Sequence, residues 1–290
     1  MSDTNDPRVQ AAEDWWETSI IKMRPGLIEF RGYPIQELIG QTSFAQMIWL
    51  LLRGGFPSAA QASLLEAALV ASVDHGPHAP SIAIARMAVT CGIDLNNAMA
   101  SAINTLGDNH GGAGQQCMEL YAHIRAAIAE GRTLEEGVEA GLDWHIETYG
   151  KVIAGFGHRF HPVDPRAEPL LGLVEQAARA GVVSGDIPPI ARAVEAAIER
   201  RTGRTIPMNI DGATAVIFAE LGFAPPLGRG LFILSRSVGI LAHAWEQSEA
   251  GGRNKGPMPK QIPFTYSGPQ TRRFESAGDV DLPSNPEVKP

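Results

Sequence analysis

The chain has few cysteines, no excess of positive charge and no long apolar segment. Its two cysteines, Cys91 and Cys117, form no CxxC pair, so we expect neither a zinc ribbon nor a disulfide framework, and this usage fits a reducing compartment. The formal net charge of −8 argues against a nucleic-acid partner, because such binding needs a clustered basic surface. No run approaches the roughly eighteen apolar residues of a membrane-spanning helix. Residues 1–14 also lack the apolar core of a signal peptide, so we expect a cytoplasmic protein with no membrane partner.

Helix-forming patterns dominate the sequence. Thr133 to Glu136 form a capping box, which predicts a helix that ends near Gly150. Alternating strand patterns are scarce, and only residues 27–30 suggest a short strand. Further helices are predicted over residues 58–73, 190–202, 212–221 and 229–247. The sequence therefore predicts an all-α fold.

The two ends of the chain differ from its centre. Residues 1–14 are polar and acidic and are predicted to be a flexible N-terminal arm. Residues 268–290 contain four prolines and few large apolar side chains, which is typical of a tail. The length of 290 residues, of which 44% are hydrophobic, allows one large domain or two of ordinary size.

One predicted helix carries a charge inside an apolar segment. Residues 231–242 are apolar on nearly every face, which predicts a buried helix, yet Arg236 lies in the middle. A buried guanidinium is costly unless it is paired. Two explanations remain open at this point, a structural ion pair with a protein carboxylate or an anionic ligand.

Three short segments place imidazoles or a carboxylate next to glycine. His110 precedes two glycines, His158 lies in a glycine-bearing loop, and Asp211 precedes glycine at a predicted helix start. Taken singly, His110 could be a structural histidine in a turn and Asp211 a helix N-cap. Arg159 and Arg166 could be solvated, or could bind a carboxylate or phosphate. Taken together, two imidazoles and a carboxylate whose pKa is raised by apolar surroundings suit acid–base chemistry at carbon.

A second pair of histidines, His75 and His78, lies in a short turn-like segment. Glycine and proline between them break any helical spacing, and a metal site would need further ligands. We therefore expect no metal site.

Taken in this order, the segments resemble the citrate synthase superfamily. The resemblance begins at Arg31-Gly32-Tyr33-Pro34 and continues to about Tyr266-Ser267-Gly268, which is most of the chain. It implies an all-α fold in which a large and a small helical domain close over the substrate, and a homodimer. On this basis we expect a large domain formed by residues 15–111 and 223–267 and a small domain formed by residues 112–222.

The resemblance also implies roles for individual residues. His110 would hydrogen-bond the thioester oxygen of acetyl-CoA, Asp211 would remove the methyl proton, and His158 would polarise the carbonyl of oxaloacetate. The substrates would be oxaloacetate and a coenzyme A thioester such as acetyl-CoA or citryl-CoA, with no permanently bound cofactor. The residues expected to hold oxaloacetate are His75, Arg166 and Arg236. The residues expected to form part of the coenzyme A cradle are Gly155, Phe156, Gly157 and Arg159.

The chain departs from the family pattern in three places. Fewer residues precede the arginine-glycine-tyrosine segment, and the loop after His158 is one residue shorter. The arginine that usually precedes the terminal tyrosine-glycine motif is replaced by Met258, although Arg253, Lys255 or Lys260 could substitute for it. These departures favour the branch that cleaves citryl-CoA, citryl-CoA lyase, over citrate synthase or 2-methylcitrate synthase. A non-catalytic module that binds CoA or a dicarboxylate, and a helical scaffold, remain as minor alternatives.

Overall fold

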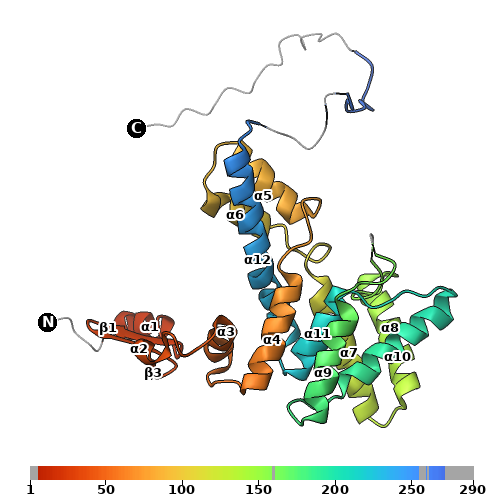
Figure 1. Cartoon of the computed structure of the whole chain (residues 1–290), viewed down its shortest axis with the longest axis horizontal. Helices are drawn as coiled ribbons and strands as arrows, with labels where there is room; N and C mark the ends of the chain where they lie inside the picture. The colour runs from red at the N-terminus through yellow and green to blue at the C-terminus, as the bar shows by residue number, and fades with distance from the viewer. Residues whose placement is uncertain (1–5, 159–160, 255–258, 260, 272–290) are drawn as a thin grey trace, which may run out of the picture. The chain divides into compact units, whose positions relative to one another are not determined.

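The computed structural model describes residues 6–158, 161–254, 259 and 261–271. Helices dominate them, as expected for the predicted all-α fold (Figure 1). The helices of the described part are α1 (Pro7–Trp15), α2 (Ile35–Leu38), α3 (Phe44–Arg53), α4 (Ala59–Ser72), α5 (Pro80–Thr90), α6 (Leu95–Ile103), α7 (Ala113–Ala129), α8 (Leu134–Tyr149), α9 (Ala167–Arg179), α10 (Ile187–Thr202), α11 (Ile210–Glu220) and α12 (Pro225–Ala250). None of them combines the length and the apolar character that a membrane crossing needs.

The N-terminal region has more regular structure than its sequence predicted. Within the expected arm over residues 1–14, residues 7–14 belong to α1, and the flexibility of the arm stays a prediction. The carboxylate of Asp6 accepts the backbone N–H of Arg8 at 2.9 Å, and Pro7 occupies the first turn, where no amide is needed. Because α1 buries no residue, it has no apolar periodicity by which the sequence could reveal it.

A small antiparallel sheet follows α1, where only residues 27–30 were predicted as a strand. β1 (Ile21–Arg24) pairs with β2 (Leu27–Phe30), and β2 pairs with β3 (Tyr33–Pro34). The turn between β1 and β2 is closed by Gly26 at φ +77°. The prediction over residues 27–30 is confirmed as β2, whereas β1 and β3 were not predicted because neither shows a clear alternating pattern.

Several helix boundaries follow from local sequence chemistry. The predicted capping box is confirmed at α8, where Thr133 Oγ1 accepts the N–H of Glu136 and the Glu136 carboxylate accepts the N–H of Thr133. Helix α10 begins three residues before the predicted start, because Pro188 and Pro189 fit the first turn of a helix. These boundaries depend on contacts within a few residues, so the sequence predicts them well.

Two apolar clusters form the core, and α12 contributes to both. The larger cluster packs α4 against α7, α8, α9, α10 and α11, and Leu231 of α12 belongs to it. The smaller cluster joins α5 and α6 to the later part of α12 through Ile240 and Ala244. Figure 1 shows α12 running beside α5 and α6, and beside α4 nearer its start. Arg236 therefore lies on α12 between the two cores. The predicted division into a large and a small domain stays a prediction.

Candidate active site

A cavity of about 200 Å³ collects residues from five parts of the chain. They come from the turn after α4, the loop before α7, the loop after α8, the start of α11 and the middle of α12. Its lining residues are His75, His110, Gly111, Gly157, His158, Ile210, Asp211, Phe232 and Arg236. All three residues predicted to be catalytic, and two of the three predicted to hold oxaloacetate, therefore line one cavity.

Asn209 fixes the start of α11 and the loop before it in one arrangement. Its Oδ1 accepts the backbone N–H groups of Asp211 and Gly212 at 2.9 and 3.3 Å, so Asn209 is the N-cap of α11. Its Nδ2 donates to the carbonyl of Gly157 at 2.6 Å. Because Asn209 is the cap, the alternative that Asp211 serves as an N-cap was wrong, and the Asp211 carboxylate is left to line the cavity.

Two glycines allow this loop to lie directly against α11. Gly155 adopts φ +87°, and a Cβ there would lie 2.6 Å from Cys117 Sγ and 2.9 Å from the Cα of Gly212. Phe156 pairs with Met208 in an isolated β-bridge, and Gly157 N–H donates to the Pro207 carbonyl at 2.7 Å. The loop that carries His158 and the helix start that carries Asp211 therefore pack directly against each other.

Asp211 is a half-buried carboxylate in a mainly apolar helix start. Burial raises its pKa, and although the charges of Arg236 and Arg166 oppose this, the pKa stays above its ordinary value. A carboxylate with a raised pKa exchanges protons more readily near neutral pH, which suits a general base or acid.

His110 is held as a neutral ring by the N-terminus of α5. Its Nε2 accepts the backbone N–H of Ser81 at 3.1 Å and lies 2.9 Å from Ser81 Oγ. Burial lowers the pKa of His110, and the nearby charge of Arg236 lowers it further. A ring whose Nε2 accepts a hydrogen bond carries its proton on Nδ1, so neutral His110 presents an N–H donor.

His158 and His75 lie against each other, with ring centroids 5.1 Å apart. Nδ1 of His158 accepts the backbone N–H of His161 at 3.0 Å, so Nε2 carries the proton of the neutral ring. Burial lowers the pKa of His158, and Asp164 only partly opposes this. Burial also lowers the pKa of His75, helped by the charges of Arg166 and Arg236. Both rings are therefore kept neutral near pH 7.

Arg236 is only 5% exposed, and it lines the cavity. Its Nε donates to the carbonyl of Ser72 at 3.2 Å, and its guanidinium lies 4.8 Å from the ring centre of Phe232. Among the described residues no carboxylate forms an ion pair with it, although Asp211 and Asp74 are close enough to raise its pKa against the effect of burial. This favours an anionic ligand over a structural ion pair.

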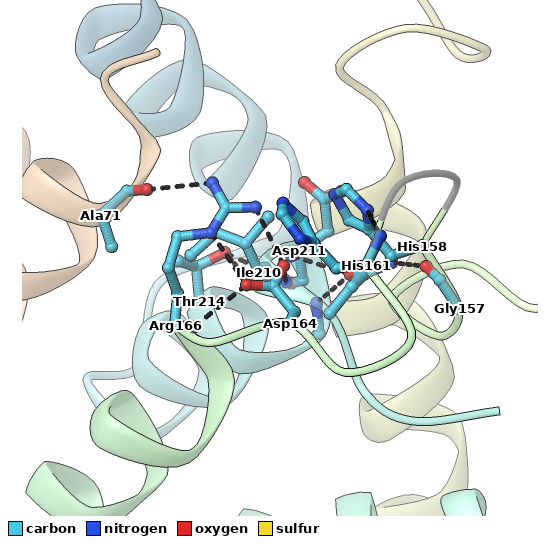
Figure 2. A network of polar contacts seen from close by, with 11 residues as sticks. Ala71, Gly157, His158, His161, Asp164, Arg166, Ile210, Asp211 and Thr214 are labelled. Atoms are coloured by element: carbon cyan, nitrogen blue, oxygen red, sulfur yellow. Dashed lines mark hydrogen bonds and ion pairs between the residues drawn. The ribbon is translucent and has the colours of Figure 1, made fainter. Parts of the chain in front are cut away.

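Arg166 lies beside the cavity and is held by a buried carboxylate. Asp164, which is 2% exposed, accepts Arg166 Nε and Nη2 at 2.9 Å each. Its Oδ2 also accepts the backbone N–H of Ile210 at the start of α11 (Figure 2). Burial raises the pKa of Asp164, but these hydrogen bonds and the arginine charge together lower it to about 2. Asp164 thus ties Arg166 to the helix that carries Asp211.

The residues predicted to bind coenzyme A do not all line the cavity. Gly157 lines the cavity, whereas Phe156 is buried in the larger core and Gly155 packs against α11. Arg159 and Met258 lie outside the described residues, as do Lys255 and Lys260. A role of the loop in coenzyme A binding stays a prediction.

Sequence reasoning missed four residues that shape the site, namely Ser81, Asp164, Asn209 and Phe232. The sequence contained a clue to two of them, since Asp164 stands two residues before Arg166 and Asn209 stands two residues before Asp211. Ser81 had no such signal, because it meets His110 only through the tertiary fold.

Comparison with known proteins identifies the family of this chain. The family model for the citrate synthase C-terminal domain matches residues 57–257. The chain belongs to the citrate synthase family. A citrate synthase of Acidithiobacillus ferridurans is 32% identical over 239 residues, which cover 80% of this chain and 57% of that protein. A citrate synthase of Haloferax volcanii is 33% identical over 203 residues, or 69% of this chain and 50% of that protein. The chain thus spans little more than half the length of these curated relatives.

Among solved structures, citryl-CoA lyase from Hydrogenobacter thermophilus resembles this citrate synthase family member over nearly its whole length. The two share 32% identity with a TM-score of 0.77, and the match covers 90% of this chain and 97% of the lyase. The all-α, citrate synthase-like fold is therefore confirmed.

Proposed function

We propose that this protein is an enzyme that makes or breaks a carbon–carbon bond between an acyl-CoA and a 2-oxo acid, and that it cleaves citryl-CoA to acetyl-CoA and oxaloacetate. The observation that carries the proposal is the shared cavity, in which three groups lie together: a carboxylate of raised pKa, a neutral histidine donor and a buried arginine that forms no ion pair with any carboxylate of the described residues.

The carboxylate and the histidine donor suit the chemistry of a thioester enol. The methyl group of acetyl-CoA is very weakly acidic, so its proton is removed only if a base acts while a donor stabilises the enol oxygen. We assign Asp211 as the base and the Nδ1–H of His110 as the donor. In the cleavage direction the carbon–carbon bond of citryl-CoA breaks as its hydroxyl loses a proton and becomes the carbonyl of oxaloacetate. The protonated Asp211, which a raised pKa favours, gives its proton to the terminal carbon of the acetyl-CoA enolate, and the proton released from the hydroxyl restores the protonated form of Asp211.

The remaining groups suit a dicarboxylate. Oxaloacetate is a dianion, and Arg236 and Arg166 offer two guanidinium groups for its carboxylates. The Nε2–H of His158 would hydrogen-bond the oxygen that is the carbonyl of oxaloacetate and the hydroxyl of citryl-CoA. His75 adds a second ring on the same side of the cavity.

Cleavage of citryl-CoA is supported by the likeness to the lyase of Hydrogenobacter thermophilus, which covers 97% of that chain. The curated relatives named citrate synthase support a second candidate, formation of citrate from acetyl-CoA and oxaloacetate. The two activities share the carbon–carbon step and differ in whether water hydrolyses the thioester of citryl-CoA.

One assay separates these candidates. Purified protein is incubated with citryl-CoA, and acetyl-CoA, oxaloacetate, citrate and free CoA are measured together. The proposal predicts acetyl-CoA and oxaloacetate, whereas citrate with free CoA would support a synthase. His110→Ala and Asp211→Ala should each lower the rate on the order of 10²-fold or more, since each removes a proton-transfer or charge-stabilising group. Variants that match the wild-type rate would contradict the site.

We also propose a homodimer, on the basis of the resemblance. Trp15 and Trp16 are 80% and 79% exposed, and large exposed aromatic side chains are common at interfaces. Light scattering at twice the chain mass would support the dimer, and scattering at the mass of a single chain would refute it.

A further inference from the structure

One face of α12 packs against the turn that carries His75. Three residues at helical spacing on α12, Arg236, Gly239 and His243, each contact residues 72–76. Positions three and four residues apart lie on the same side of a helix, so these contacts form a single stripe. The first residue of the stripe lines the cavity and the last lies outside its lining.

Contact begins at Arg236, whose Nε donates to the Ser72 carbonyl at 3.2 Å. At Gly239 the helix lies so close to the turn that a Cβ would collide with the carbonyl oxygen of Val73. At His243, Nε2 lies 3.3 Å from the carboxylate of Asp74. The turn is thus held at three consecutive residues.

Asp74 also holds the backbone around His75 through hydrogen bonds. Its Oδ2 accepts the N–H of Gly76 at 3.0 Å, and the backbone N–H of His75 also interacts with its carboxylate. Because the Asp74 carboxylate accepts hydrogen bonds from backbone N–H groups at and after His75, it restricts the rotation of the backbone there. The position of the His75 ring in the cavity therefore depends on Asp74.

Arg86 of α5 sets the hydrogen bonding of His243. Its Nη1 lies 3.2 Å from His243 Nδ1 and 2.5 Å from a Glu246 carboxylate oxygen. Because arginine can only donate, Nδ1 accepts, and the N–H that faces Asp74 is on Nε2. Helix α5 also carries Ser81, the partner of His110. Helix α12, the turn that carries His75 and helix α5 therefore meet at this one imidazole.

We infer that His243 is a positioning residue which, through Asp74, sets His75 and Arg236 for a dicarboxylate ligand. The inference rests on the proposed function, because it takes oxaloacetate as that ligand. It assigns His243 no contact with substrate. Its loss should weaken the dicarboxylate part of the site and leave coenzyme A binding unchanged.

A double-mutant cycle tests the inference by calorimetry. The Kd of oxaloacetate is measured for wild type, His243→Leu, Asp74→Asn and the double variant. Each single change should raise Kd roughly tenfold, as expected for loss of a hydrogen bond to a charged group. The Kd of the double variant should exceed that of either single variant by no more than about twofold, since both changes remove the same interaction. The Kd of coenzyme A should stay within about twofold throughout.

Two further variants guard against a general loss of structure. His243→Gln keeps an N–H donor near the position of Nε2 and should recover most of the lost affinity. His78→Leu replaces an exposed histidine close to the same turn and should leave the Kd of oxaloacetate unchanged. Thermal unfolding by circular dichroism identifies any variant that is not folded at the temperature of the titration.

The outcomes distinguish the inference from the function on which it rests. If wild type binds oxaloacetate and His243→Leu binds it equally well, the positioning role is wrong while the proposed function stands. The same holds if the two single effects multiply to about a hundredfold in the double variant, or if coenzyme A affinity falls in parallel. If wild type binds no oxaloacetate, the proposed function fails and the inference fails with it.

Discussion

Replacement of Asp164 by asparagine removes a buried charge that stabilises both the fold and the site. The carboxylate accepts two guanidinium N–H groups of Arg166 and the backbone N–H of Ile210. Asparagine keeps one acceptor oxygen but turns an N–H₂ group toward one of these donors. Asp164→Asn should therefore destabilise the protein and release Arg166 from its position beside the cavity (Figure 2).

The magnitude follows from the pKa of Asp164. It falls from 3.8 to about 2 on folding, and the difference of about 1.8 units corresponds to about 2 kcal/mol of stability for the charged form. Because the folded pKa is the lower one, this contribution is complete above about pH 4 and is lost as the pH falls toward 2. The stability of wild type should therefore drop through this window by about 2 kcal/mol more than that of Asp164→Asn.

Urea unfolding at a series of pH values measures this difference. Glu168→Gln is the matched control, because Glu168 also pairs with an arginine, Arg192, but both side chains are largely exposed. An exposed pair contributes only about 0–1 kcal/mol, so the control should change little. If wild type and Asp164→Asn lose stability in parallel between pH 4 and pH 2, the buried pair does not contribute as argued.

Three further predictions concern the loop and the start of α11. Gly155→Ala should lower the unfolding free energy by more than Gly150→Ala in urea titrations, because both glycines have positive φ but only Gly155 is crowded; equal losses would refute the packing argument. Asn209→Ala should cost roughly 1–2 kcal/mol through loss of the cap and of the hydrogen bond to Gly157, whereas Asn209→Ser keeps a cap oxygen and should lose only the hydrogen bond to Gly157, so equal costs would contradict this division. The pH profile of kcat/KM for formation of citryl-CoA from acetyl-CoA and oxaloacetate should fall on the acid side at a pH above 3.8, because Asp211 acts there as a base and its pKa is raised; a rate unchanged down to pH 4 would rule out this role.

The sequence predicts well those features that depend on near neighbours. The all-α fold, the capping box at Thr133 and the buried position of Arg236 follow from patterns within a few residues. Helix α1 and strands β1 and β3 were missed, because none of them carries an apolar repeat long enough to detect. Proline residues 188 and 189 were read as preceding a helix, although their geometry also suits its first turn.

The sequence predicted the residues that line the candidate site but not the residues that hold them in place through hydrogen bonds. His110, His158, Asp211 and Arg236 stand out because each is a polar group in a glycine-bearing or apolar setting. The hydrogen bond of Ser81 to His110 joins residues 29 positions apart, and that of His243 to Asp74 joins residues 169 apart. No local pattern contains such information, and it is these contacts that set tautomers and orientations.

The central claim is that Asp211 and His110 act together on the methyl group of a coenzyme A thioester. Exchange of that group's hydrogens with deuterated water, followed by mass spectrometry of acetyl-CoA in the presence of oxaloacetate or a non-reacting dicarboxylate, tests it independently of the reaction direction. Wild type should incorporate deuterium, and Asp211→Asn and His110→Ala should lose on the order of 10²-fold or more of the exchange rate. Exchange at the wild-type rate in either variant would show that Asp211 and His110 do not act together on this methyl group.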